Sequence, residues 1–166
     1  MRIPIGIEVS TDNTNWYKLT DHNRNPIQIK YDLVQNEQRM ADGTLRKYIV
    51  ARKFKITADW NNLPTLDSNL VDYKLALGDV KGNAKAAAWI KAFYEANVFF
   101  PVWIKLRFAK DSTPAVGSVP SASTYVTSEF TDGQIFNAYM SSFTYDIQKR
   151  NGSYDYVNCT IEFTEI

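Results

Sequence analysis

The chain has 166 residues, which suits a single domain in which folding buries roughly 70% of the surface that the open chain exposes. A formal net charge of +1 gives no overall field to attract nucleic acid, and one cysteine and one histidine exclude an internal disulfide and a multi-histidine metal site. We therefore expect one domain over residues 1–166, with no metal and no cofactor.

The N-terminus and the hydropathy indicate a soluble protein. Residues 1–6 contain no long apolar run and no small-residue cleavage site, so they do not resemble a signal peptide. No stretch approaches the roughly 20 apolar residues that span a bilayer. We expect synthesis in a reducing cytoplasm and no contact with a membrane.

Two short extended segments open the chain. Residues 3–9 alternate between apolar and other side chains, which predicts a half-buried strand. Turn-forming residues at 12–15 follow, and residues 16–19 then resume an extended pattern.

Residues 27–60 predict a long β-hairpin. Its apolar residues take odd positions from Ile27 to Leu33 and even positions from Tyr48 to Trp60, on either side of the turn formers Asp42-Gly43. A two-residue turn there places residues opposite each other when their numbers sum to 85. The predicted pairs are Tyr31 with Phe54, Ile29 with Ile56 and Ile27 with Ala58, all on one face.

This hairpin is too long to lie wholly within a core. Each arm would span roughly 45–50 Å at about 3.3 Å per residue, whereas most strands have about 3–10 residues. The distal part, 35–47, is nearly all polar, so either it is a projecting arm that an outside partner stabilises or it is a polar loop. On the first interpretation the expected inter-subunit contacts are Gln35, Glu37, Arg39, Asp42, Arg46 and Lys47.

The same hairpin carries a run of basic residues. Lys47, Lys53 and Lys55 are predicted to share its polar face, with Arg39 and Arg46 near the tip. Such a face is either merely solvated or meets an acidic neighbour, and the first is the usual case.

The middle of the chain mixes helix, strand and loop. Residues 61–82 are irregular, although Leu66, Leu70, Tyr73 and Leu77 have the spacing of a short helix. Asn83 is a good N-cap for a helix over Ala84–Asn97, and residues 99–108 return to strand. Residues 111–133 are rich in Ser, Thr, Pro and Gly, which is typical of a binding loop or a disordered one.

A second hairpin closes the chain. Phe143, Tyr145 and Ile147 line one face of its first strand, and Val157, Cys159, Ile161 and Phe163 line one face of its second. Since both sets are odd, the loop needs an odd number of residues, and Arg150-Asn151-Gly152 provides three. This loop places Phe143 opposite Cys159 and Tyr145 opposite Val157.

No catalytic motif stands out, so we expect no enzyme. Cys159 and His22 could form a nucleophile and base, but a thiol on an apolar strand face is usually buried, and His22 lies among turn formers. A hydrolase with two carboxylates stays open, although most acidic residues lie in turns, where they bond local backbone. Exposed Tyr and Trp rings would instead suit a β-sandwich module that binds glycans on a phage or bacterial surface.

Three segments resemble the small tail proteins of long-tailed bacteriophages. The first is Ile7-Glu8-Val9-Ser10-Thr11-Asp12, leading to Asn15-Trp16-Tyr17-Lys18-Leu19. The second runs from Arg39-Met40-Ala41-Asp42-Gly43-Thr44 to Asp59-Trp60-Asn61-Asn62-Leu63-Pro64. The third is Phe143-Thr144-Tyr145-Asp146-Ile147-Gln148-Lys149-Arg150 with Tyr154-Asp155-Tyr156-Val157-Asn158-Cys159.

The resemblance implies a tail-tube-like fold, mainly β of the α+β type. An antiparallel β-sandwich or barrel with one flanking helix would carry a long protruding hairpin, and sheets of neighbouring subunits would join into a ring. The implied role is a structural virion protein of the tail tube, the distal tail or a head-proximal connector. Its implied partners are identical copies and other tail proteins, with DNA passing through the lumen without sequence-specific binding.

Overall fold

The computed structural model describes residues 4–73, 82–108, 134–150 and 152–166. Its strands form one seven-stranded antiparallel sheet in the order β2-β1-β5-β6-β7-β4-β3. In chain order the elements are β1 Pro4–Ser10, β2 Tyr17–Leu19, β3 Gln28–Arg39, β4 Leu45–Pro64, the 3-10 turn η1 Asp67–Asn69, α1 Ala87–Asn97, β5 Val102–Phe108, β6 Gln134–Arg150 and β7 Asp155–Glu165. The prediction of a mainly β, antiparallel fold with one helix is confirmed for the described residues.

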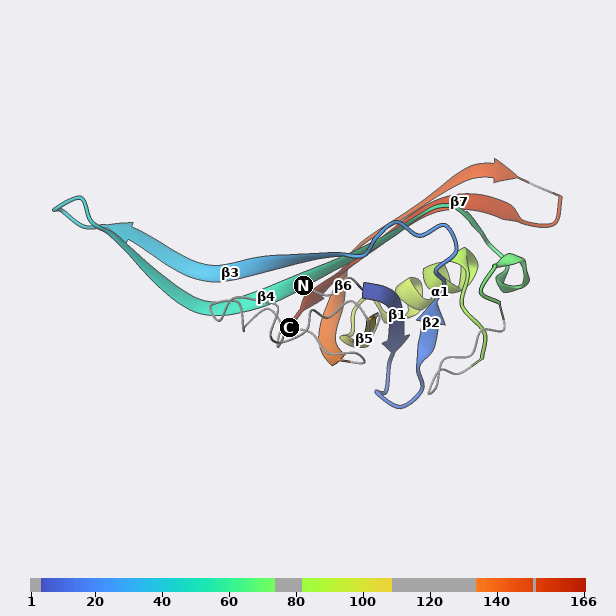
Figure 1. The fold of residues 1–166 in the computed structure, drawn as a ribbon, viewed down its shortest axis with the longest axis horizontal. Coiled ribbons are helices and arrows are strands. Elements are labelled where there is room, and N and C mark those ends of the chain that lie inside the picture. Colours follow the sequence, from blue (N-terminus) through green and yellow to red (C-terminus); the bar gives the residue numbers. More distant parts are fainter. Residues whose placement is uncertain (1–3, 74–81, 109–133, 151) are drawn as a thin grey trace, which may run out of the picture.

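One hydrophobic core joins the sheet to the helix. Strands β1, β4, β5 and β7 contribute alternate residues, and α1 adds Ala87, Ile90 and Phe93. In Figure 1, α1 and the short strands β1, β2 and β5 gather beside the middle of the long strands. The largest fully buried side chains include Trp60, Phe163, Ile7, Leu19 and Leu63.

The helix begins three residues later than predicted, and the expected N-cap Asn83 is wrong. The backbone of Lys85 bonds to β2 instead: its N–H donates to the Lys18 carbonyl at 2.9 Å, and its carbonyl accepts from Thr20 N–H at 3.2 Å. The next N–H, that of Ala86, donates to Asp67 Oδ1 at 2.7 Å. Helix geometry therefore starts only at Ala87.

The long hairpin forms as predicted at its base, except that the strand pairing begins at Gln28 with Thr57 and does not include the predicted pair Ile27–Ala58. Ile29 pairs with Ile56 and Tyr31 with Phe54. The turn differs, because Met40 N–H donates to the Thr44 carbonyl at 2.9 Å and leaves a three-residue loop, with only Gly43 at positive φ. Between Val34–Ala51 and Gln35–Ile49 the register shifts, so that Val50 is an extra, bulged residue that offsets the change at the turn.

The C-terminal hairpin has the predicted faces but another register. Phe143 pairs with Ile161 and Tyr145 with Cys159, so the predicted partners Cys159 and Val157 are wrong by two residues. Arg150 pairs with Asp155, which leaves four connecting residues, and Gln148 bulges between Ile147 and Lys149. The four loop residues and the one bulged residue together make five, an odd number like the three residues of the predicted loop. Both arrangements place the odd-numbered residues of the two strands on one face, so the alternation pattern does not distinguish them.

Between these hairpins the irregular segment is only partly described. Residues 67–69 form η1 rather than a longer helix, and residues 74–77 lie outside the described residues. The expected interaction loop at 111–133 also lies outside them.

Candidate assembly surface

The first half of β4 and the paired part of β3 form a two-stranded arm. β7 pairs with β4 only from Lys55 to Pro64, so residues 45–54 of β4 extend past the end of the C-terminal strand. Figure 1 shows this arm leaving the body in one direction while the far ends of β6 and β7 leave it in the other. We use "the arm" for residues 32–54.

The base of the arm is fixed by aromatic and chain-end contacts. The rings of Tyr31 and Phe54 have centroids 5.2 Å apart, and Phe54 lies 5.5 Å from Phe136 of β6. Phe54 N–H donates to Glu165 Oε2 at 3.1 Å, and Lys53 Nζ donates to the main-chain oxygen of Ile166. The arm therefore leaves the body from a packed base, and its orientation is set there.

Beyond this base the arm exposes apolar side chains. Tyr48 is 71% exposed and Val50 is 66% exposed. Leu33, Val34, Leu45 and Ile49 are between 43% and 54% exposed. An isolated two-stranded ribbon is marginally stable, and an apolar one has surface to bury against a partner.

The bulge at Val50 rotates part of the arm relative to the sheet. On the body side of the bulge, residues 51–57, the even residues of β4 share the core-side face with the odd residues of β3. On the tip side, residues 45–49, the odd residues of β4 take that face. Tyr48 therefore pairs with Asn36 on the opposite face from Phe54 and Ile56, and its predicted place on the apolar face is wrong. For the same reason, the prediction that Lys47 shares a face with Lys53 and Lys55 is wrong.

All six predicted contact residues lie on the exposed part of the arm or its turn: Gln35, Glu37, Arg39, Asp42, Arg46 and Lys47. Glu37 accepts from Gln35 Nε2 at 3.1 Å and lies 3.6 Å from Lys47 Nζ. Arg39 Nη1 donates to the Gly43 carbonyl at 3.2 Å. Hydrogen bonds from Thr44 to Asp42 lower the pKa of that carboxyl, so the turn keeps its negative charge.

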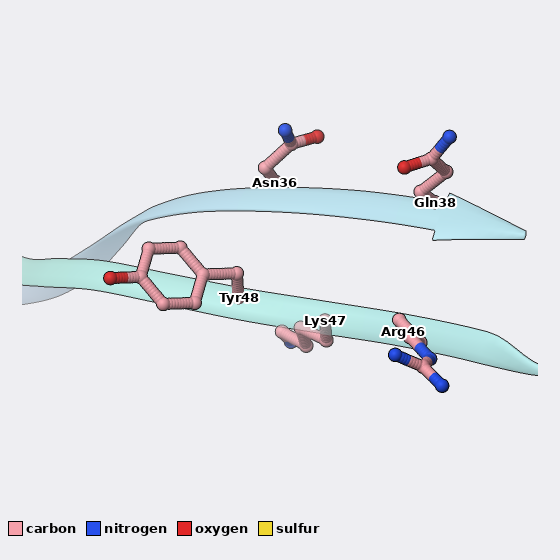
Figure 2. Close-up of a pocket in the computed structure, with 5 residues that line it drawn as sticks. All are labelled: Asn36, Gln38, Arg46, Lys47 and Tyr48. Carbon is pink, nitrogen blue, oxygen red and sulfur yellow. The ribbon is translucent and has the colours of Figure 1, made fainter.

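A shallow hollow lies on the arm itself. Asn36 and Gln38 of β3 and Arg46, Lys47 and Tyr48 of β4 line it, as Figure 2 shows. The exposed Tyr48 ring and the Arg46 guanidinium suit contact with a protein surface, since Tyr and Arg are enriched where interfaces bind tightly. An alternation pattern does not reveal this hollow, because the bulge that creates it is hidden in the sequence.

Two strand edges are open within the described part of the chain. β3 ends the sheet, and no described strand pairs with its outer side from Asp32 to Arg39. β6 pairs with β5 only from Gln134 to Ala138, so among the described strands none covers that side of β6 from Tyr139 to Arg150. The outer edge of β2, in contrast, is covered by the backbone of Lys85.

The candidate nucleophile, Cys159, and the candidate base, His22, both have structural roles. Cys159 is fully buried between Trp60 and Tyr145, and burial raises the pKa of its thiol to about 12, far from the range of a reactive thiolate. His22 Nδ1 accepts the Val71 N–H at 2.9 Å. These contacts support the structural interpretation of both residues.

The turn carboxylates bond local groups as predicted where they are described. Asp12 accepts from the N–H groups of Thr14 and Asn15 at 2.9 and 2.8 Å, and these bonds lower the pKa of its carboxyl. Asp21 contacts Lys18 and Arg24. Asp111 and Asp132 lie outside the described residues.

Sequence reasoning missed the apolar character of the arm. It placed Tyr48 and Val50 on the apolar face of the hairpin, because they continue the even-numbered pattern of Phe54 and Ile56. In the structure β7 pairs with β4 only from Lys55 to Pro64, so both side chains lie beyond the part of β4 that β7 covers.

No helix among the described residues is long and apolar enough to cross a membrane. In that same part of the chain, no cluster of three or more His, Cys, Asp or Glu side chains is placed to hold a metal ion.

The chain was also compared with known proteins. No protein-family model matches it, and no curated protein sequence matches it.

Proposed function

We propose that this protein is a structural subunit of a bacteriophage tail that assembles into rings with identical copies. The observation that carries the proposal is the pair of open edges on strands that run in opposite directions. Because β6, β7, β4 and β3 alternate in direction, β3 of one copy lies antiparallel to β6 of a neighbour in the same orientation. A repeated four-stranded unit then continues one antiparallel sheet from copy to copy.

The physical chemistry of the edges favours this assembly. Each unpaired edge offers a row of N–H and C=O groups that another strand can pair, and proteins that stay monomeric usually block such edges. The segment Asp32–Arg39 has no proline and no lysine, and its charged residues are Asp32, Glu37 and Arg39. The two edges differ, so the contact is head-to-tail, and a head-to-tail contact closes into a ring when the rotation per copy divides a full turn.

The arm has two roles in this proposal. Its β3 edge, Asp32–Arg39, pairs with β6 of a neighbouring copy, and its tip, which projects away from the body (Figure 1), contacts another ring or another tail protein. The subunit would reside in the virion tail after synthesis in the host cytoplasm. DNA would pass through the lumen without sequence-specific contacts. The tube, the distal tail and the head-proximal connector all remain compatible roles.

A glycan-binding module receives less support. Such a site stacks sugars on exposed aromatic rings, but Trp16 and Trp60 are buried, Trp89 stacks on Phe93 at 5.0 Å, and Trp103 is half-buried. None of the four tryptophans forms an exposed platform. The exposed aromatic side chains, Tyr48, Tyr139, Phe99 and Phe100, lie on β4, on β6 and after α1 rather than on one element.

Negative-stain imaging and sedimentation velocity of the purified chain, over rising protein concentration and several salt concentrations, test the proposal. We expect rings or short tubes of uniform diameter. A protein that stays monomeric under every condition would contradict the proposal.

A further inference from the structure

The segment that follows η1 is held against the turn that follows β2. Leu70 is 5% exposed and packs in the core, whereas the side chain of Val71 is 79% exposed. Two attachments fix the backbone beside this exposed side chain. The N–H of Val71 donates to His22 Nδ1 at 2.9 Å, and the carboxylate of Asp72 accepts hydrogen bonds from the turn. We call residues 70–72 the latch segment.

The attachment through Asp72 depends on a negative charge. Its carboxylate accepts from Thr20 Oγ1 at 2.6 Å and from Asp21 N–H at 2.8 Å, and Lys18 Nζ lies 3.4 Å away. Burial acts to raise the pKa of the Asp72 carboxyl, but these hydrogen bonds and the charge of Lys18 lower it overall. This attachment is therefore kept until the pH falls below the usual range of an Asp carboxyl.

The attachment through His22 depends on a neutral ring. A backbone N–H can only donate, so the Nδ1 atom that faces Val71 carries a lone pair, and the proton of the neutral ring is on Nε2. In the imidazolium both nitrogens carry hydrogen, so the ring can no longer accept this bond. Histidine is the side chain whose charge ordinarily changes between about pH 5 and 8. His22 is only half-buried, so protons from the solvent reach it.

We propose that His22 is a pH-operated latch, which holds the latch segment on the turn after β2 while its ring is neutral and releases the Val71 N–H when its ring is protonated. The closed arrangement binds one proton fewer than the released one, so closure is favoured as pH rises and is lost as pH falls. The release is local, because Leu70 stays in the core and Asp72 keeps its own hydrogen bonds. This inference does not rest on the proposed role in a phage tail.

The charged groups around the ring balance one another. Among the described residues they are Lys18, Asp21 and Arg24 from β2 and its turn, Asp72 from the latch segment, Asp59 of β4, which accepts from Asn25, and Lys85, whose backbone bonds to Thr20. The phenol of Tyr73 follows the latch segment. Three carboxylates and three cations give neither form of the ring a clear advantage. The hydrogen bond from Val71 is therefore the contact that distinguishes the two states.

Amide hydrogen exchange, followed residue by residue by NMR, tests the latch. The quantity to compare is the protection factor, because the intrinsic exchange rate itself changes with pH. We expect protection at Val71 to fall about fivefold between pH 8 and pH 5, the factor that one ordinary hydrogen bond contributes. The midpoint should coincide with the titration of the ring signals, which belong to His22 because the chain has one histidine. The Ala86 amide, which donates to Asp67 Oδ1 at 2.7 Å, is the internal control and should keep its protection.

Two variants separate the charge of the ring from its hydrogen bond. His22→Asn can place an acceptor oxygen where Nδ1 lies and does not titrate, so Val71 should stay protected from pH 8 to pH 5. His22→Phe keeps a ring but has no acceptor, so Val71 should exchange at the released level at both pH values.

Three results would overturn the latch. The first is protection at Val71 that stays constant in the parent chain while the ring titrates. The second is a loss of protection in His22→Asn equal to that of the parent chain, because another group would then be responsible. The third is protection in His22→Phe equal to that of the parent chain at pH 8. If His22→Phe does not fold, the parent chain and His22→Asn still decide. None of these results depends on ring formation, so the latch and the proposed function can fail separately.

Discussion

Tyr31 and Phe54 face each other across β3 and β4 with ring centroids 5.2 Å apart, at the point where the arm leaves the body. Phe54 also contacts Phe136, so one side chain connects the arm to β6. The arm beyond it is a ribbon of two strands. The direction in which the arm projects is therefore controlled by a small aromatic cluster, and the cluster can be tested apart from the tip.

Replacing Phe54 with alanine should loosen this base. Because Phe54 is only half-buried, we expect a loss of about 2 kcal/mol in the free energy of unfolding, less than the 3–5 kcal/mol that full burial would give. Amide hydrogen exchange in residues 32–50 should also become faster. The matched control Tyr48→Ala removes a ring that is 71% exposed and should change stability by less than about 0.5 kcal/mol. Urea unfolding measures the free energy of unfolding of both variants. Equal losses in the two would contradict the assignment of Phe54 to the base of the arm.

Deleting residues 37–46 and closing the strands with Asn-Gly should leave a folded monomer and abolish assembly. The deleted residues contribute nothing to the buried core, so the thermal midpoint should change by only a few degrees. The deletion shortens the open β3 edge and removes the tip, so sedimentation should show a monomer at concentrations where the parent chain assembles. An unfolded product would place the arm in the core and refute its assignment as an assembly element.

Most of the fold can be predicted from the alternation of apolar and polar residues, and the errors of that prediction have a common cause. The pairs Ile29–Ile56 and Tyr31–Phe54 are predictable because both residues are apolar and turn formers lie between the strands. The faces of Tyr48 and Lys47 are not predictable, because the bulge at Val50 leaves no mark in residue type. Similarly, the helix start depends on Lys85 bonding to β2, a contact between segments far apart in sequence.

The candidate assembly surface could also be predicted only in part. Length and polarity single out the arm, and its six predicted contact residues are all exposed on it. The open edge of β6 depends on which strands end early and which lie side by side. Sheet order is a tertiary property, so this edge cannot be inferred from one strand alone.

Asp72 should make stability depend on acid pH. Burial alone would raise the pKa of this carboxyl, but hydrogen bonds from Thr20 Oγ1 at 2.6 Å and Asp21 N–H at 2.8 Å, with the charge of Lys18, lower it overall. A lowered folded-state pKa means that the stabilisation is present above the usual Asp pKa of about 4 and is lost as pH falls through the folded value.

Asp72→Asn should therefore cost about 2–3 kcal/mol at pH 7, because it removes the charge that faces buried Lys18 and weakens two hydrogen bonds. The difference from the parent chain should shrink in acid, as Asp72 itself becomes protonated. Glu95→Gln on the exposed side of α1 is the control and should show neither effect. Denaturant unfolding at pH 7 and at several pH values below 4 measures both, and a constant difference across pH would contradict the assignment.

Paired cysteines should report the β3-to-β6 contact between copies. Cys159 is buried with its pKa raised to about 12, so it should not react at neutral pH, and the native chain is a suitable background. We expect Val34→Cys, combined in turn with Ser142→Cys, Thr144→Cys or Asp146→Cys, to give a disulfide ladder on a non-reducing gel from at least one pair. The longest rung would equal the number of copies in a ring. Gln35→Cys with the same partners is the control, because its side chain lies on the other face of the sheet and a disulfide needs Cβ atoms about 3.5–4.5 Å apart. Rings that form without any of these cross-links would show that copies join through other surfaces.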